Sequence, residues 1–217
     1  MTARKRVAIL ISGRGSNMRS LVEAARAPGY PAEIVIVVSN RPDAPGLAWA
    51  KSQGIPTLGL DHKHYESREH FDGQLHAVLA ASRVDIVALA GFMRLLTPDF
   101  VGKWLNRMIN IHPSLLPAFK GLKTHERALA AGVRISGCTV HFVRPEVDDG
   151  PILAQAAVPV LDGDTSEVLA ARVLNAEHQI YPHALALFAS DQIKIDGESV
   201  RISGPINQEL TLFSPSL

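Results

Sequence analysis

Short runs of apolar, β-branched residues alternate with helical patterns over the first ninety residues, and this alternation constrains the fold of the chain. Continuous apolar runs occupy residues 7–11, 34–38 and 84–90, and each is typical of a strand buried on both faces. Residues 16–27, 45–51 and 65–82 carry helical patterns between them. Strands separated by helices need crossover connections and are therefore parallel. The sequence predicts an α/β fold: a Rossmann-like, open, mostly parallel sheet with helices on both faces.

The second half of the chain alternates less regularly. Strands are predicted at 107–112, 136–143 and 152–160, in addition to a short one at 55–60. Asp164 and Glu167 have the spacing of a helix N-cap and its N3 partner, which predicts that a long helix opens there. Pro182 is expected to kink or end that helix, and 191–203 is predicted to form a hairpin. We expect residues 1–217 to form a single domain.

Charge and hydropathy limit the classes of function. Lys and Arg number 22 against 21 Asp and Glu, a net charge of +1, which argues against a nucleic-acid-binding surface. The apolar run at 7–11 is too short for a secretory signal, and charges interrupt the apolar tract at 77–93, so it cannot cross a bilayer. We expect a cytoplasmic protein with no nucleic-acid and no membrane partner.

The first candidate site is the turn at 12–17, which reads S-G-R-G-S-N between a predicted strand and a predicted helix. Its glycines let backbone N–H groups approach an anion at the positive end of the helix, and Ser16 and Asn17 add side-chain donors. Met18 stands where a dinucleotide fingerprint has its last glycine, so a single phosphate fits better. A tight turn with a helix cap is the alternative.

The second candidate is the segment at 110–117, which reads N-I-H-P-S-L-L-P. Asn110 and His112 lie two apart and therefore share one face of a strand, which Pro113 ends. In open α/β sheets, ligands bind beyond the carboxyl ends of the strands. There an amide and an imidazole suit a reaction that builds negative charge on a carbonyl oxygen. A histidine that only caps the strand end is the alternative.

The third candidate is the acidic turn at 146–151, E-V-D-D-G-P. One of its aspartates is suited to orient a histidine and to stabilise its charged form, although Asp and Gly also favour turns for backbone reasons alone. The spacing does not choose between Asp148 and Asp149. His62 and His64 have no third ligand at metal spacing, so no metal site is expected. Cys138 is expected to be a small buried residue.

Taken together, these segments resemble the phosphoribosylglycinamide formyltransferase family, the folate-dependent enzymes of purine biosynthesis. The resemblance covers roughly residues 7–182 and rests on G-S-N at 15–17, A-G-F-M-R at 90–94, the segment 110–117 and D-x-G at 148–150. It implies formyl transfer from 10-formyltetrahydrofolate, used as a co-substrate, to the amine of glycinamide ribonucleotide. No metal is required by that reaction in the family. A homodimer is left open.

The resemblance also implies roles for individual residues. The catalytic trio is Asn110, His112 and Asp148, with Asp149 at a variable position. The N-terminal half is expected to bind the substrate phosphate, and the C-terminal half to supply part of the folate site and the acidic turn. The residues implied for the ribonucleotide are Gly15, Ser16, Asn17 and Glu177. Those implied for the folate are Arg68, Met93, Arg94, Leu95, Leu96, Asn110, Arg144 and Val147.

Two other classes of function are distinguishable from this one. A nicotinamide-dependent reductase on the same fold would be stabilised against heat by NADPH rather than by a folate. A non-catalytic binding module would bind a phosphorylated metabolite without turnover. Such a module does not explain why Asn110, His112 and an acidic turn all suit a single oxyanion.

Overall fold

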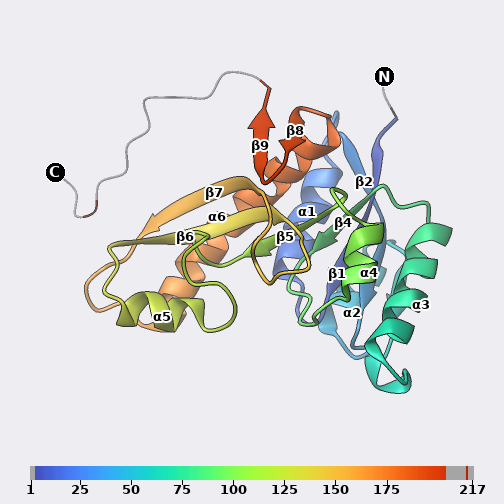
Figure 1. The fold of residues 1–217 in the computed structure, drawn as a ribbon, viewed down its shortest axis with the longest axis horizontal. Coiled ribbons are helices and arrows are strands. Elements are labelled where there is room, and N and C mark those ends of the chain that lie inside the picture. Colours follow the sequence, from blue (N-terminus) through green and yellow to red (C-terminus); the bar gives the residue numbers. More distant parts are fainter. Residues whose placement is uncertain (1–2, 204–213, 215–217) are drawn as a thin grey trace. The chain divides into compact units, whose positions relative to one another are not determined.

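The computed structural model of the chain describes residues 3–203 and Ser214 (Figure 1). These residues fall into two units. Unit 1 runs to Asn110 and includes Phe142–Pro145, and unit 2 comprises Ile111–His141 and the described residues from Glu146 onward. Each unit is described by itself below. The single domain over residues 1–217 stays a prediction.

The elements of unit 1 follow the predicted alternation of strands and helices. Its strands are β1 (Lys5–Ile11), β2 (Ala32–Ser39), β3 (Thr57–Gly59) and β4 (Ile86–Leu89). Its helices are α1 (Ser16–Ala25), α2 (Pro45–Ser52), the 3₁₀ turn η1 (His62–His64), α3 (Arg68–Ala81) and α4 (Pro98–Lys103). The next strand, β5 (Met108–His112), begins in unit 1 and ends in unit 2.

Unit 2 contains two paired strands, two helices and a C-terminal hairpin within its described residues. They are α5 (Thr124–Ala130), β6 (Ile135–Phe142), β7 (Ile152–Pro159), α6 (Ser166–Ala189), β8 (Ile193–Asp196) and β9 (Ser199–Ile202). Figure 1 shows β6 and β7 running side by side, with β8 and β9 as a separate short ribbon. The hairpin predicted at 191–203 is therefore confirmed.

Seven strands of the described chain form one sheet in the order β3-β2-β1-β4-β5-β6-β7. The pairs β1–β2, β1–β4, β2–β3 and β4–β5 are parallel, and β6–β7 is antiparallel. The mostly parallel α/β sheet is confirmed. Strand order reverses at β1, which has β2 on one side and β4 on the other. The carboxyl ends of β1 and β4 therefore form the switch point where ligands bind in open sheets of this kind.

The core of unit 1 puts helices on both faces of the sheet, as predicted. One buried cluster combines Ala8 and Leu10 of β1 with residues of β2, β4, α3 and α4, and each fully buried large side chain contributes about 1.5–3 kcal/mol. On the other face, the N–H of Gly46 in α2 donates to the Gly13 carbonyl (3.1 Å). A Cβ at Gly46 would lie 2.5 Å from Cδ1 of Ile11, so α2 lies directly on the end of β1.

Two details of α6 differ from the sequence prediction. The helix begins at Ser166, and its N-cap is Thr165, whose hydroxyl accepts from the N–H of Val168 (3.4 Å). Asp164 is not the cap because two hydrogen bonds from Arg172 (2.6 and 2.9 Å) hold its carboxylate. Those bonds, with the N–H of Leu161, lower the pKa of Asp164 to about 2.

Pro182 lies inside α6, which continues to Ala189, so the option that it ends the helix is wrong. Beyond Pro182 the helix buries Ala184, Leu185 and Ala189. This packing stabilises the last turns of the helix despite the proline.

Three short helical elements were not predicted: η1, α4 and α5. They span three, six and seven residues, too few to show a helical period. The N-cap position of α5 is Lys123, a residue in the left-handed region at φ 58°, which no sequence rule for caps anticipates. Among the described helices, none is long and apolar enough to cross a membrane.

Candidate active site

Ser12 joins three loops of unit 1 at the switch point of the sheet. Its N–H donates to the Gly91 carbonyl (3.1 Å), and its hydroxyl accepts from the N–H of Met93 (2.8 Å). The same hydroxyl donates to Oδ1 of Asn40 (2.5 Å). Ser12 and Asn40 are both buried. The turns that follow β1, β2 and β4 are therefore held together by one buried hydroxyl.

The turn predicted to bind phosphate opens α1 in the expected way. Gly15 is the residue before the helix and has φ 69°, a left-handed conformation that glycine adopts without strain. Ser16 and Asn17 are the first two helical residues, so their N–H groups lie at the positive end of the helix dipole. The backbone geometry therefore suits an anion at Gly15, Ser16 and Asn17.

The loop after β4 carries the next predicted residues, Met93, Arg94, Leu95 and Leu96. Met93 and Leu95 expose 72% and 59% of their surface, while Leu96 packs against the core of unit 1. The guanidinium of Arg94 lies 4.4 Å from the ring centroid of Phe71 in α3. Arg68 is the exposed first residue of the same helix. Two exposed apolar side chains beside a strand end suit the flat ring of a ligand.

The end of β5 carries the predicted amide and imidazole. Asn110 is half-buried and His112 is buried with 5% of its surface exposed. We call residues 113–121 the proline loop. It is anchored to β6 by Thr139, whose hydroxyl donates to the Ser114 carbonyl (2.7 Å) and accepts from the N–H of Leu116 (3.0 Å). This anchoring explains how the chain can turn sharply away directly after His112.

Unit 2 brings His112 and Asp148 together. The Nδ1 atom of His112 lies 3.2 Å from Oδ2 of Asp148, and both side chains are largely buried. Asp148 belongs to the acidic turn at 146–151 and has φ 51°. Its Oδ2 also accepts from the N–H of Gly121 in the proline loop (2.9 Å). Of the two aspartates that the spacing left open, Asp148 is the one that faces the histidine.

Both ring nitrogens of His112 face oxygen atoms. Nε2 lies 3.0 Å from the carbonyl of Phe119, while Nδ1 faces the Asp148 carboxylate. A neutral imidazole has only one N–H, so both contacts are hydrogen bonds only when the ring carries two. Each ring nitrogen that carries a hydrogen therefore has an oxygen acceptor within reach.

Sequence reasoning missed a second histidine at this site. His141 is buried in β6, and its Nε2 lies 3.7 Å from Oδ1 of Asp148. Thr139, which anchors the proline loop, lies two residues earlier on the same strand. The sequence did contain a signal for His141. Thr139 and His141 are polar residues two apart in an apolar strand and therefore share one face, as Asn110 and His112 do. His125 also lies near His112, and burial first, then the charge of His112, lowers the pKa of His125.

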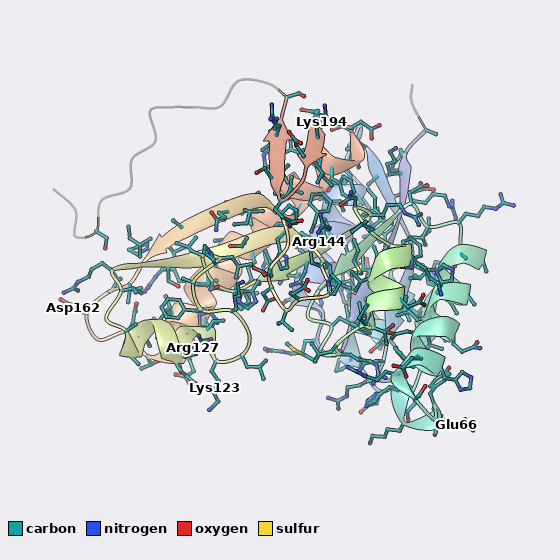
Figure 2. All side chains as sticks on the ribbon, viewed as in Figure 1. Glu66, Lys123, Arg127, Arg144, Asp162 and Lys194 are labelled. Atoms are coloured by element: carbon teal, nitrogen blue, oxygen red, sulfur yellow. The ribbon has the colours of Figure 1, made fainter. Side chains whose placement is uncertain are left out.

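The remaining predicted residues are distributed over both units. Glu177 is buried on α6 in unit 2. Val147, in the acidic turn of unit 2, is exposed, and Arg144 in unit 1 is half-buried and labelled in Figure 2. A carboxylate as buried as that of Glu177 needs partners, so its burial is compatible with a binding role as well as with a structural one.

A cavity of about 420 Å³ lies in unit 2 beside the acidic turn. Its walls come from the proline loop, the acidic turn, β7 and the C-terminal hairpin, with Leu116, Lys120, Asp148, Ile152 and Val200 among the lining residues. The volume is in the range of small-molecule pockets. The cavity gives access to the side of the turn on which Asp148 lies.

Cys138 is a buried strand residue, as expected, and its environment makes it inert. Burial, and then the charge of Glu177, raises the pKa of the thiol to about 12. At pH 8 only about one thiol in ten thousand is then ionised, and the thiolate is the reactive form. We expect no reaction of the folded protein with a chromogenic disulfide reagent at pH 8, and one thiol per chain after denaturation. Fast labelling of the folded protein would contradict this.

In the described part of the chain, no group of three or more His, Cys, Asp or Glu side chains is arranged to hold a metal ion. His62 contacts the Asn40 carbonyl (2.9 Å) and His64 lies 3.9 Å from Asp61. The two histidines are thus engaged separately, within the loop that precedes α3.

Comparison with known proteins identifies relatives of the whole fold. A family model described as formyl transferase matches residues 5–185. The chain is 41% identical over 198 residues to phosphoribosylglycinamide formyltransferase of Escherichia coli, covering 91% of this chain and 93% of the relative. It is also 46% identical to the crystal structure of glycinamide ribonucleotide transformylase 1 from Symbiobacterium toebii, with a TM-score of 0.91, covering 94% and 96% of the two chains.

A second group of relatives is much longer. The chain is 53% identical over 197 residues to the trifunctional purine biosynthetic protein adenosine-3 of Bos taurus, a match that covers 91% of this chain and 19% of the relative. The chain therefore spans about a fifth of the length of these relatives.

Proposed function

The chain belongs to the formyl transferase family, and we propose that it transfers a formyl group from 10-formyltetrahydrofolate to the amine of glycinamide ribonucleotide. The observation that carries the proposal is the buried pair formed by His112 and Asp148 at the end of β5. The names of the relatives, which refer to this ribonucleotide and to purine biosynthesis, support the choice of substrate.

The reaction needs a hydrogen-bond donor that stabilises the negative charge of its intermediate. When the amine nitrogen attacks the formyl carbon, a new carbon–nitrogen bond forms and charge builds on the formyl oxygen. His112 donates Nε2–H to that oxygen, which replaces the Phe119 carbonyl as the acceptor, and Asp148 stabilises the charged ring through Nδ1. The amide of Asn110 is proposed as a second donor. A donor placed at an oxyanion lowers the barrier by about 3–4 kcal/mol.

The intermediate then collapses towards products. The bond between the formyl carbon and the folate nitrogen breaks, and the proton released by the attacking amine passes to that leaving nitrogen. Asp148, held by the N–H of Gly121 and by His112, is proposed to assist this transfer. The atoms balance: one carbon–nitrogen bond forms, one breaks, and one proton moves between the two nitrogens.

The binding residues are proposed one by one. The N–H groups at Gly15, Ser16 and Asn17 hold the phosphate of the ribonucleotide at the start of α1, where the helix dipole favours an anion, and Glu177 contacts the same substrate. The proposed folate contacts are Arg68, Met93, Arg94, Leu95, Leu96, Asn110, Arg144 and Val147. The folate is a co-substrate, no metal takes part, and we propose the cytoplasm as the place of the reaction.

The proposal is tested with purified protein, glycinamide ribonucleotide and 10-formyltetrahydrofolate, following the folate product by its absorbance. We expect multiple turnovers that require both substrates. Each substrate, or a folate analogue, at 100 times its Kd should stabilise the fold by about 2.7 kcal/mol, which raises Tm by roughly 5–10 °C in a protein of this size.

Three outcomes count against the proposal. Stabilisation by NADPH and not by a folate would favour a reductase. Formate release without the ribonucleotide would favour a hydrolase. Binding of the ribonucleotide to a well-folded protein, with no turnover after addition of the formyl donor, would favour a non-catalytic binding module.

A further inference from the structure

We propose that Lys120 and Asp149 are positioning residues for the reaction, and that their ion pair holds the acidic turn so that Asp148 faces His112. The inference rests on the proposed function, because it concerns the same histidine and aspartate. It assigns a role to the second aspartate of the turn, whose position is variable in the family that the sequence resembles. It also assigns a role to a lysine that the sequence analysis did not single out.

Asp148 needs stabilising contacts from other residues because its backbone is strained. At φ 51° it occupies the left-handed region, which costs a residue with a side chain roughly 1 kcal/mol or more. Its carboxylate lies 3.2 Å from Nδ1 of His112. Such a conformation persists only where the surrounding contacts fix it, so the contacts of the acidic turn decide whether Asp148 stays beside the histidine.

The proline loop supplies those contacts through consecutive residues. Lys120 forms an ion pair with Asp149, and the N–H of Gly121 donates to Asp148 (2.9 Å). The preceding residue, Phe119, places its carbonyl 3.0 Å from Nε2 of His112. Residues 119–121 thus contact both the histidine and the turn, and the ion pair joins the two segments beside the catalytic pair.

The loop side of this ion pair is itself braced by α5. Nη1 of Arg127 donates to the Lys120 carbonyl (2.5 Å), and the Arg127 guanidinium lies 5.6 Å from the ring centroid of Phe119. Figure 2 labels Arg127 on this short helix and Lys123, the residue directly before it. The backbone that carries Lys120 is therefore anchored. Because the lysine is held in place, its ion pair with Asp149 restricts the position of the acidic turn.

The energy available to the ion pair sets the size of the expected effect. The side chains of Lys120 and Asp149 are 37% and 54% exposed, and pairs at such sites contribute modestly and are screened by salt. If the free energy of the ion pair is lost from the stabilisation of the transition state, kcat falls about threefold to fivefold. That is small enough to leave the fold intact and large enough to measure.

The experiment is a double-mutant cycle on the full chain with Asp149→Asn, Lys120→Met and the double variant. We expect each single variant to lower kcat about threefold to fivefold, with KM for both substrates changed less than twofold and Tm lowered by at most about 4 °C. Because one pair is broken in every case, the double variant should be no slower than either single variant.

Salt dependence supplies a readout that a merely structural role would not move. With saturating substrates, kcat of the unmodified protein should fall towards that of Asp149→Asn as NaCl rises from about 0.05 to about 1 M, where screening becomes effective within a few ångströms. The kcat of Asp149→Asn should not change with salt. The matched control is Asp162→Asn, which breaks the exposed pair of Asp162 with Arg134 in the same unit and should behave like the unmodified protein.

The outcomes separate this inference from the proposed function. No turnover in the unmodified protein would contradict the function itself. Turnover with unchanged kcat in both single variants, or effects of the two substitutions that multiply in the double variant, would overturn the role of the pair. If Asp149→Asn fails to fold, Lys120→Met and the salt titration of the unmodified protein still decide.

Discussion

Replacing His112 with alanine should lower kcat about 10²–10³-fold, the cost of removing one donor from a developing oxyanion. The substitution removes the contacts of the ring with Asp148 and with the Phe119 carbonyl. It also removes the Nε2–H that we propose as the donor to the formyl oxygen. KM for the ribonucleotide should change little, because the proposed phosphate contacts lie at the start of α1. Steady-state kinetics with both substrates varied measures the two quantities separately.

The control for this substitution is His64→Ala. That histidine exposes 82% of its side chain in the loop before α3, and its removal should leave kcat unchanged. Circular dichroism and Tm show whether the His112 variant is folded, since His112 is buried. A folded His112→Ala protein with a kcat within threefold of the unmodified protein would falsify the assignment of His112 as the oxyanion donor.

The largest expected effect on stability comes from Gly137→Ala. A Cβ at this position in β6 would lie 2.0 Å from the carbonyl oxygen of Ala156 in β7, and 2.9 Å from Cδ2 of Leu115 in the proline loop. The nearest atom belongs to the backbone of a paired strand, so it cannot move aside as a side chain would. We expect a loss of about 3 kcal/mol, which lowers Tm by roughly 6–12 °C.

Gly73→Ala is the matched substitution. Gly73 lies within α3, and a Cβ there would meet no other atom within 4 Å. Alanine is the better helix former by about 1 kcal/mol, so this variant should be as stable as the unmodified protein or slightly more stable. Urea unfolding of both variants provides the comparison, and equal midpoints for the two would show that β6 and β7 can separate to admit the methyl group.

The fold could be predicted where one physical signal dominates. Strands buried on both faces, such as Val7–Ile11, show as continuous apolar runs, and α3 shows Phe71, Leu75 and Leu79 on one face. The cap of α6 was misplaced by one residue because Asp164 and Thr165 are both suitable caps by type. The competing partner of Asp164 is Arg172, which lies on the next turns of the helix and is visible only once the chain is folded.

The candidate site was predictable in part for the same reason. His112 and the two aspartates of the acidic turn stand in short, distinctive segments, but the spacing left the choice of aspartate open. The family resemblance implied Asp148, and the structure places Asp148 in contact with His112. Folding of β6 and the proline loop brings His141 and Gly121 to Asp148, and Lys120 to Asp149. No local pattern marks a lysine or a glycine as the partner of an aspartate 27 or more residues away. The contacts that fix the aspartate are therefore a property of the tertiary structure.

The C-terminal hairpin has a practical consequence. Residues 198–200 form part of the wall of the cavity beside Asp148, yet the family model ends at residue 185. A preparation trimmed to the matched range would lack that wall and would admit bulk solvent to Leu116 and Ile152. Sequence changes at residues 198–200 can thus change the polarity around Asp148 without altering any residue that the family model matches.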